Sequence, residues 1–288
     1  MKNTKKTKSL RDLLRNDDFL LMPGCFNALS ARLVEQAGFP AVYISGAGVA
    51  INFLGYPDIG LISMAEVLEN ARNIAQATEI PAICDADTGF GNVVNVIRTV
   101  RDFENAGLAG IQLEDQVMPK KCGHTEGISL ISKNEMVQKI KTAVDTRRNR
   151  DFVLVIRTDS IAVNGIEDAL DRAHAYEEAG ADVIFVEALQ NVKQMKRVAR
   201  TIKVPLMANM VEGGGKTPIL PVADLKSLGF KIAIYPSSLC MVSIKAMQEV
   251  LQILKKHGTS LPYAGHMVSF QEMFEVVGRS QYSAIEKK

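Results

Sequence analysis

The sequence predicts an α/β fold, a (β/α)8 TIM barrel, and three observations favour it. Short β-branched runs alternate with longer runs of helical period along the 288-residue chain. That length accommodates the roughly 250 residues of such a barrel and leaves some chain over. Several helical runs end in Ala-Gly or Leu-Gly directly before the next strand. An open doubly wound sheet is the alternative, but no Gly-x-Gly-x-x-Gly motif follows an early strand.

The strands and helices are expected to alternate in the following order. The strands are residues 20–22, 41–45, 82–85, 110–114, 152–157, 183–187, 205–209 and 231–235, each a short run rich in β-branched or apolar residues. Helices are expected at residues 28–37, 64–78, 93–106, 133–147, 166–179, 192–201 and 222–228, where apolar residues recur at helical spacing. Gly38, Gly107, Gly180 and Gly229 stand where four of these helices end.

Both ends of the chain extend beyond the predicted barrel. Residues 243–255 and 271–288 have a helical pattern, and we expect this C-terminal extension to pack against a partner subunit. The basic run at residues 2–8 is predicted to be a solvated tail. Because no linker-like stretch interrupts the chain, residues 1–288 are expected to form a single domain.

The composition excludes several classes of function. Apolar residues make up 47% of the chain, which is ample for a large core, and the net charge is only +2. No nucleic-acid or membrane surface is predicted, and no run reaches the ~20 apolar residues of a membrane span. The four cysteines lie far apart without Cys-x-x-Cys spacing, so free thiols in a reducing cytoplasm are expected.

Polar side chains follow the predicted strands, at the end of the barrel where active sites form. They are Ser45, Asp85 with Asp87, Glu114 with Asp115, Arg157 with Asp159, Glu187, Asn209 and Tyr235. Any one of them is more often a loop cap than a catalyst. Several carboxylates in one pocket, however, repel one another strongly unless a cation or a proton lies among them. The pattern therefore predicts a bound divalent metal.

Asp85-Ala86-Asp87 is the best local candidate for the metal ligands. Its two carboxylates project the same way, and Thr88-Gly89-Phe90-Gly91 gives a permissive turn after them. Oxygen ligands without paired His or Cys nearby favour Mg²⁺ or Mn²⁺ over Zn²⁺. Glu114 and Asp58 could hold waters of the metal. The alternative is that Asp85 and Asp87 only cap the loop.

Cys122 and Arg157 also have the chemistry of a site. Cys122 lies in Lys120-Lys121-Cys122-Gly123-His124, an electropositive setting that lowers a thiol pKa from about 8.5; the alternative is a bystander thiol on a surface loop. Arg157 ends an apolar strand, where a guanidinium is costly unless it is paired. It could grip a substrate carboxylate with two parallel hydrogen bonds, and a salt bridge to Glu187 or Asp159 is the alternative.

In this order the residues resemble the isocitrate lyase and phosphoenolpyruvate mutase superfamily. The resemblance covers nearly the whole chain, and Lys120-Lys121-Cys122-Gly123-His124 is its most specific part, because it looks like the signature of the lyase branch. The family implies a barrel whose eighth helix is swapped between subunits, usually in a tetramer. It also implies Mg²⁺, with Mn²⁺ as a substitute, held by Asp85 and Asp87 and, through water, by Asp58 and Glu114.

The resemblance further implies retro-Claisen cleavage of a 2-hydroxy acid. The pyruvate-like half of the substrate is expected against the metal and Arg157. Cys122, on a loop that closes over the site, is the expected general acid, and Tyr43 is one candidate for the base. The remaining residues expected to bind substrate are Ser45, Gly46, Ala47, Gly123, His124, Glu187 and Asn209.

The substrate is expected to be a 2-alkylmalate such as 2,3-dimethylmalate, cleaved to pyruvate and propanoate. 2-Methylisocitrate lyases resemble the chain closely but carry two further arginines where this sequence has Met241 and Phe270. A third carboxylate would then lack its partner, whereas an alkyl group would suit both side chains. Residues 210–218 also look like the dimethylmalate lyase type.

Other functions stay open. 2-Methylisocitrate lyase is the nearest alternative, and hydrolysis or decarboxylation of oxaloacetate uses the same kind of metal site. Phosphonopyruvate-type mutase chemistry is disfavoured by Cys122 and His124. A non-catalytic barrel that senses a dicarboxylate is the alternative from another class, and it would release no keto acid.

Overall fold

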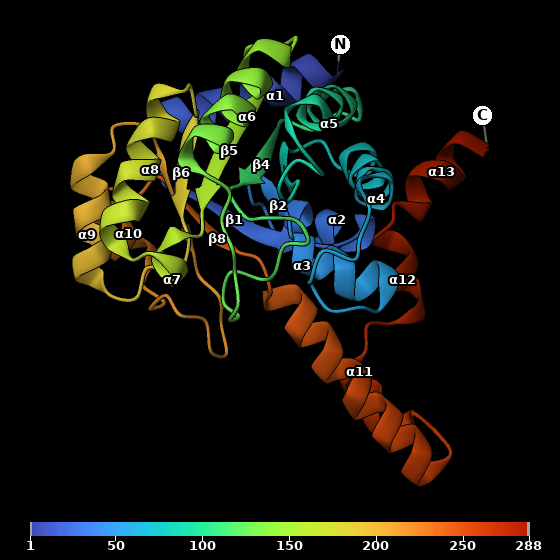
Figure 1. Cartoon of the computed structure of the whole chain (residues 1–288). Helices are drawn as coiled ribbons and strands as arrows, with labels where there is room; N and C mark the ends of the chain where they lie inside the picture. The colour runs from blue at the N-terminus through green and yellow to red at the C-terminus, as the bar shows by residue number, and fades with distance from the viewer. Residues whose placement is uncertain (1, 287–288) are drawn as a thin grey trace.

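The computed structural model describes residues 2–286 and contains a closed barrel of eight parallel strands (Figure 1). Each strand pairs with the next along the chain, and β8 pairs with β1 to close the barrel. The strands are β1 Leu20–Cys25, β2 Val42–Ile44, β3 Ala82–Asp85, β4 Gly110–Glu114, β5 Val153–Thr158, β6 Val183–Val186, β7 Leu206–Asn209 and β8 Ile232–Tyr235. The predicted (β/α)8 barrel is confirmed.

Helices surround the barrel in the order that the sequence predicts. Those expected are α2 Ala28–Gln36, α4 Met64–Ala77, α5 Val93–Asn105, α6 Lys133–Thr146, α8 Ile166–Glu178, α9 Val192–Thr201 and α10 Val222–Leu228. Short helical turns that the sequence did not predict are α3 Gly46–Val49, the π-helical turn η1 Ala50–Leu54 and α7 Ser160–Val163. Gly38, Gly107, Gly180 and Gly229 have φ angles of 85°, 99°, 105° and 103°, so they end their helices in the left-handed conformation as predicted.

Two apolar clusters form the core. The larger cluster lies between the strands and the surrounding helices, and the smaller one fills the barrel interior. Because successive strand residues point to opposite faces, neighbours such as Ile83 and Cys84 belong to different clusters. The barrel is therefore a packed core, and its carboxyl end is the place where polar side chains can gather.

The basic run at the N-terminus is not a solvated tail. It forms helix α1, Lys2–Arg15, whose Leu10 and Leu14 are buried in the barrel-interior cluster. Lys6 is also buried, and its ammonium donates to backbone carbonyls of residues 75 and 78 at 2.6 and 2.5 Å. Arg11 donates to the carbonyls of residues 150 to 152, just before β5. Helix α1 thus closes the amino end of the barrel, opposite the strand ends that carry the predicted site.

The C-terminal extension first leaves the barrel along α11, Ser238–His257, and then turns back, so that the Val276 carbonyl accepts from Gln36 Nε2 of α2 at 2.9 Å (Figure 1). It consists of α11, the 3₁₀ turn η2 Leu261–His266, α12 Phe270–Glu275 and α13 Arg279–Glu286. The predicted helix at 271–288 is thus split in two, and its residues 287 and 288 lie outside the described part. Met241, Ile244, Met247, Leu251 and Leu254 form a stripe of exposed apolar side chains along α11. No helix within residues 2–286 is both long and apolar enough to cross a membrane.

Replacement of Leu10 by alanine tests the closure by α1. Leu10 is fully buried, so Leu10→Ala should lower the free energy of unfolding by about 2–5 kcal/mol in urea denaturation. Leu29, 49% exposed on α2, is the control, and Leu29→Ala should change this free energy by less than about 0.5 kcal/mol. Equal effects of the two substitutions would mean that α1 is not part of the core.

Candidate active site

The carboxyl ends of the strands surround a small cavity of about 70 Å³. Its walls contain eleven of the residues that the sequence predicts for the site: Tyr43, Ser45, Ala47, Asp58, Asp85, Cys122, Gly123, His124, Arg157, Glu187 and Asn209. The three others lie directly behind them. Gly46 packs on Asp85, Asp87 pairs with Lys120, and Glu114 contacts Arg157. The structure therefore brings the predicted residues together, and their roles remain predictions.

Lys120 lies between two of the predicted metal ligands. Its Nζ atom is 2.6 Å from Asp58 Oδ1 and 2.9 Å from Asp87 Oδ1, and all three side chains are largely buried. Burial disfavours the charged ammonium, but Asp87 and Asp58 outweigh this cost and raise the pKa of Lys120 well above its usual range. The sequence analysis did not assign Lys120 to the site, although it belongs to the motif around Cys122.

Asp85 is held from both sides at the end of β3. Its Oδ1 atom accepts hydrogen bonds from the Asp87 backbone N–H and from Gln112 Nε2, both at 3.1 Å. A Cβ atom at residue 46 would lie 2.8 Å from Asp85 Oδ2, so glycine is needed for the carboxylate to lie against this turn. Burial and the neighbouring Asp87 raise the pKa of Asp85 to about 6.

The charges of the site do not balance. The two cations Lys120 and Arg157 contact or adjoin six carboxylates. These belong to Asp58, Asp85, Asp87, Glu114, Asp159 and Glu187. Both carboxylate oxygens of Glu114 are buried and accept no hydrogen bond from the described residues. Burial accordingly raises the pKa of Glu114 well above its usual range.

These carboxylates fit a hard cation such as Mg²⁺, although they are not gathered into a finished metal site. Within residues 2–286, no group of three or more His, Cys, Asp or Glu side chains is placed to hold a metal ion as the structure stands. Lys120 and Arg157 are cations among these carboxylates and relieve part of their repulsion, and the bound divalent metal stays a prediction. The oxygens of Glu114, which accept no hydrogen bond from the described residues, and the oxygen-only donor set still suit Mg²⁺.

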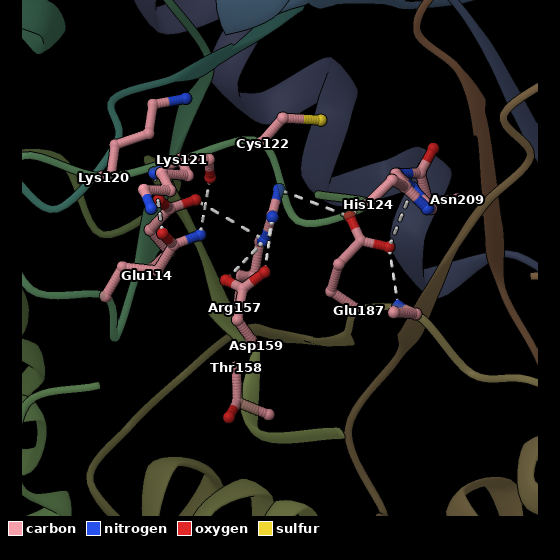
Figure 2. Close-up of polar contacts among 12 residues, drawn as sticks. Glu114, Lys120, Lys121, Cys122, His124, Arg157, Thr158, Asp159, Glu187 and Asn209 are labelled. Atoms are coloured by element: carbon pink, nitrogen blue, oxygen red, sulfur yellow. Dashed lines mark hydrogen bonds and ion pairs between the residues drawn. The ribbon is translucent and has the colours of Figure 1, made fainter. Parts of the chain in front are cut away.

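Arg157 occupies the centre of the site, between Glu114 and Glu187 (Figure 2). Asp159 accepts from its Nε and Nη2 at 3.0 and 2.6 Å, so the two-pronged face of the guanidinium is already used. The expected bidentate grip on a substrate is therefore not available on that face. The Nη1 atom, 3.4 Å from Glu187 Oε2, is the group that can still bind an incoming carboxylate.

Residues 116–131, which we call the Cys122 loop, fold over the cavity. A Cβ atom at Gly123 would lie 2.3 Å from Arg157 Nη2 and 2.6 Å from Asp159 Oδ1, so only glycine allows this approach. Two contacts hold the ends of the loop together. The Val117 backbone N–H donates to the Ser129 carbonyl, and Leu130 forms a β-bridge with Gln116. The loop that the sequence predicts to close over the site thus lies over the cavity in this structure.

Cys122 is less acidic than the sequence suggests. Burial raises the pKa of its thiol, while a hydrogen bond with the His124 backbone opposes this effect. The expectation of a lowered pKa is wrong because the Lys120 ammonium turns toward Asp58 and Asp87. A thiol that keeps its proton at neutral pH is suited to donate one.

His124 joins the Cys122 loop to the segment after β7. Its Nδ1 accepts the Lys216 backbone N–H at 3.0 Å, while Lys216 Nζ donates to the Thr125 carbonyl at 3.1 Å. Because Nδ1 is an acceptor, the neutral ring carries its proton on Nε2, which lies 3.5 Å from Glu187 Oε1. Sequence analysis did not anticipate this contact between loops.

Tyr43 is better placed as a hydrogen-bond donor than as a base. Its hydroxyl donates to Gln112 Oε1 at 2.7 Å, and Gln112 in turn donates to Asp85. Burial, with Asp85 close by, raises the pKa of Tyr43 well above its usual range, which disfavours the phenolate that a base requires. Gln112 was missed, although it precedes Glu114 by two residues on β4 and so shares its inward face.

Met241 and Phe270 do not form the expected alkyl pocket within this chain. They are 42% and 74% exposed, and neither borders the cavity. Met241 lies on α11, and Phe270 is the first residue of α12. Apolar walls are supplied instead by Ala47, Phe185, Val211, Ile234 and Pro236.

Comparison with known proteins agrees with this geometry. The family model described as phosphoenolpyruvate phosphomutase matches residues 10–255. The chain is 47% identical over 277 residues to a 2,3-dimethylmalate lyase of Eubacterium barkeri, with 96% of both chains covered. It is 44% identical over 273 residues to a 2-methylisocitrate lyase of Aeropyrum pernix, with 95% of this chain and 87% of the relative covered.

A solved structure of oxaloacetate acetylhydrolase with 3,3-difluorooxalacetate superposes with a TM-score of 0.94 at 33% identity, covering 99% of this chain and 97% of the other. The fold and site thus define a barrel of the phosphoenolpyruvate mutase and isocitrate lyase superfamily. This chain belongs to the phosphoenolpyruvate phosphomutase family, and relatives with the names of lyases match it along nearly all of its length.

Proposed function

We propose that this protein is a Mg²⁺-dependent carbon–carbon lyase that cleaves a 2-alkylmalate such as 2,3-dimethylmalate to pyruvate and propanoate. The observation that carries the proposal is that carboxylates and apolar side chains line the same cavity. Lys120 and Arg157 are the two Lys or Arg side chains that line it in the described chain, and both already face carboxylates. The wall near Val211, Ile234 and Pro236 suits an alkyl group better than a third carboxylate.

Mg²⁺ is proposed to bind at Asp85 and Asp87, with Asp58 and Glu114 contributing through water. The support is the oxygen-only donor set and the buried carboxylate of Glu114, whose oxygens accept no hydrogen bond from the described residues. Bound there, the ion would lower the pKa of a 2-hydroxyl group and stabilise the negative charge that develops on its oxygen.

The chain's own residues have separate tasks in this proposal. Arg157 Nη1 orients a substrate carboxylate, and the Cys122 loop excludes water from the cavity. Cys122 donates its proton to the carbon of the enediolate fragment after the carbon–carbon bond breaks. Glu187 and Asn209 line the far side, where Asn209 Nδ2 donates to Glu187 Oε2 at 2.9 Å.

The first test compares substrates. Pyruvate release from 2,3-dimethylmalate and from 2-methylisocitrate should be measured by coupled NADH oxidation, with Mg²⁺ and with EDTA. Dimethylmalate should be turned over with the higher kcat/KM, and EDTA should abolish turnover. Preference for 2-methylisocitrate would refute the two-carboxylate pocket, and pyruvate release unaffected by EDTA would refute the metal dependence.

A second test separates lyase from decarboxylase chemistry. Cys122→Ala should lower cleavage of dimethylmalate by about 10²–10⁴-fold, because the general acid is lost. Decarboxylation of oxaloacetate requires no acid at that place and should fall much less. Cys122→Ser, close in size, should behave like the alanine variant since a serine hydroxyl is a far weaker acid. Equal losses in both reactions would contradict the role of Cys122.

We further propose that the protein is a homo-oligomer, a tetramer in which α11 is swapped between subunits. We also propose that it lies in the cytoplasm. The support for the assembly is the stripe of apolar side chains along α11, which is exposed in this chain. The support for the compartment is that all four cysteines are free thiols.

The stripe offers a direct test of this assembly. Leu251→Glu places a charge on the exposed apolar face of α11, so it should reduce the mass measured by light scattering after size-exclusion chromatography. Val192→Glu, at a 44% exposed position on α9, is the control and should leave the mass unchanged. A monomeric wild-type protein would refute the assembly.

A further inference from the structure

A second buried polar cluster lies behind the active site, centred on Asp115. This carboxylate is fully buried and directly follows Glu114, but it turns to the other face of the sheet. Its Oδ2 accepts from the hydroxyls of Thr158 and Tyr176, both at 2.8 Å, and from Arg172 Nη1 at 3.1 Å. Asp115 therefore has its hydrogen-bonding capacity filled by groups outside the cavity.

Asp115 also fixes the residue that holds Arg157. Its Oδ1 accepts the backbone N–H of Asp159 at 3.0 Å, and the Asp159 side chain clamps the guanidinium of Arg157. Figure 2 shows Thr158 pointing away from Arg157, as alternation along the strand requires. Any shift of Asp115 would accordingly move the Asp159 backbone and, with it, the central cation of the site.

Arg172, on α8, connects this cluster to the Cys122 loop. Besides Asp115, its Nη1 donates to the backbone carbonyl of Ile131 at 3.0 Å, where the loop ends. The Ile131 backbone N–H donates to the Asp115 carbonyl at 2.9 Å, so both ends of the loop are tied to one place. The Nε of Arg172 is held in turn by Asp168 at 2.8 Å.

We propose that Arg172 is a positioning residue for the reaction. It fixes the positions of Arg157 and of the Cys122 loop relative to each other. The importance of these two groups rests on the proposed function. Arg172 touches no part of the cavity and acts only through Asp115 and Ile131. Its single guanidinium thus links the group that orients the substrate to the group that delivers the proton.

Stability alone does not account for this arrangement. A buried ion pair is often no more stable than well-packed apolar residues of similar volume, because both ions lose their hydration. Arg172 and Asp115 are 7% and 0% exposed, so this cost is present here. An apolar pair could not form hydrogen bonds to three elements at once. Arg172 and Asp115 together bind the end of β4, the start of the turn after β5 and the base of the loop.

The test uses Cys122 as a reporter of the loop. Of the four cysteines, Cys25, Cys84 and Cys240 are buried and Cys122 is partly exposed, so iodoacetamide should modify Cys122 first. The alkylation rate at Cys122, followed by mass spectrometry, then measures how often the loop opens. The variants are Arg172→Gln and the milder Tyr176→Phe, which removes one donor to Asp115. Arg197→Gln, which breaks an exposed ion pair with Glu167, is the matched control.

In Arg172→Gln we expect faster alkylation of Cys122 and a fall in kcat/KM for dimethylmalate of about 10–100-fold. KM should rise because Arg157 is displaced, and kcat should fall because Cys122 is displaced. Tyr176→Phe should show the same changes at smaller size, and Arg197→Gln should match the wild type. A lower melting temperature without these changes would indicate a merely structural role and overturn the proposal.

The outcomes separate this inference from the proposed function. If Arg172→Gln folds by circular dichroism but either alkylation or kcat/KM stays at the control value, the inference is wrong. If Arg172→Gln does not fold, Tyr176→Phe decides by the same two measurements. If the wild type does not cleave dimethylmalate, the proposed function fails, and the alkylation rates alone then decide whether Arg172 holds the loop.

Discussion

The excess of buried carboxylates at the mouth of the barrel is the constraint on which the rest of the site depends. Charges removed from water are costly unless opposite charges or protons compensate them. Three kinds of compensation are visible: Lys120 between Asp58 and Asp87, Arg157 clamped by Asp159, and the raised pKa of Asp85. The shortfall that remains is the physical reason to expect a divalent cation.

This constraint also couples the Cys122 loop to the electrostatics of the site. Lys120 belongs to the loop, so the loop in this position supplies the cation that contacts Asp58 and Asp87. The loop approaches closely because Gly123 has no side chain, and His124 meets Lys216 on the facing segment. The position of the loop therefore brings both the Lys120 ammonium and the Cys122 thiol to the site, and Lys120 offsets part of the carboxylate charge there.

The sequence was sufficient for the barrel and for most of the residues that the strand ends bring together, because both depend on local pattern; Lys120 and Gln112 were missed. Strand ends and left-handed glycines such as Gly107 can be recognised one residue at a time. The direction of a side chain cannot be recognised in this way, and this explains the error at Cys122: the Lys120 ammonium contacts Asp58 and Asp87, and burial raises the pKa of the thiol. Helix α1 was missed for a related reason, since its lysines obscured the buried Leu10 and Leu14.

Met241 and Phe270 show a different limit, and it concerns specificity. Met241 follows β8 closely enough to suggest a pocket, but it lies on α11, which points away from the barrel, and Phe270 lies beyond it at the start of α12. The strand ends provide the carboxylates, Arg157 and Asn209, which are the parts that any 2-oxo or 2-hydroxy acid would need. The segments after β7 and β8, with Val211 and Pro236, provide an apolar wall. Because loops accept substitutions that strand ends do not, the proposed function would have its reaction set by the strand ends and its choice of substrate by these segments.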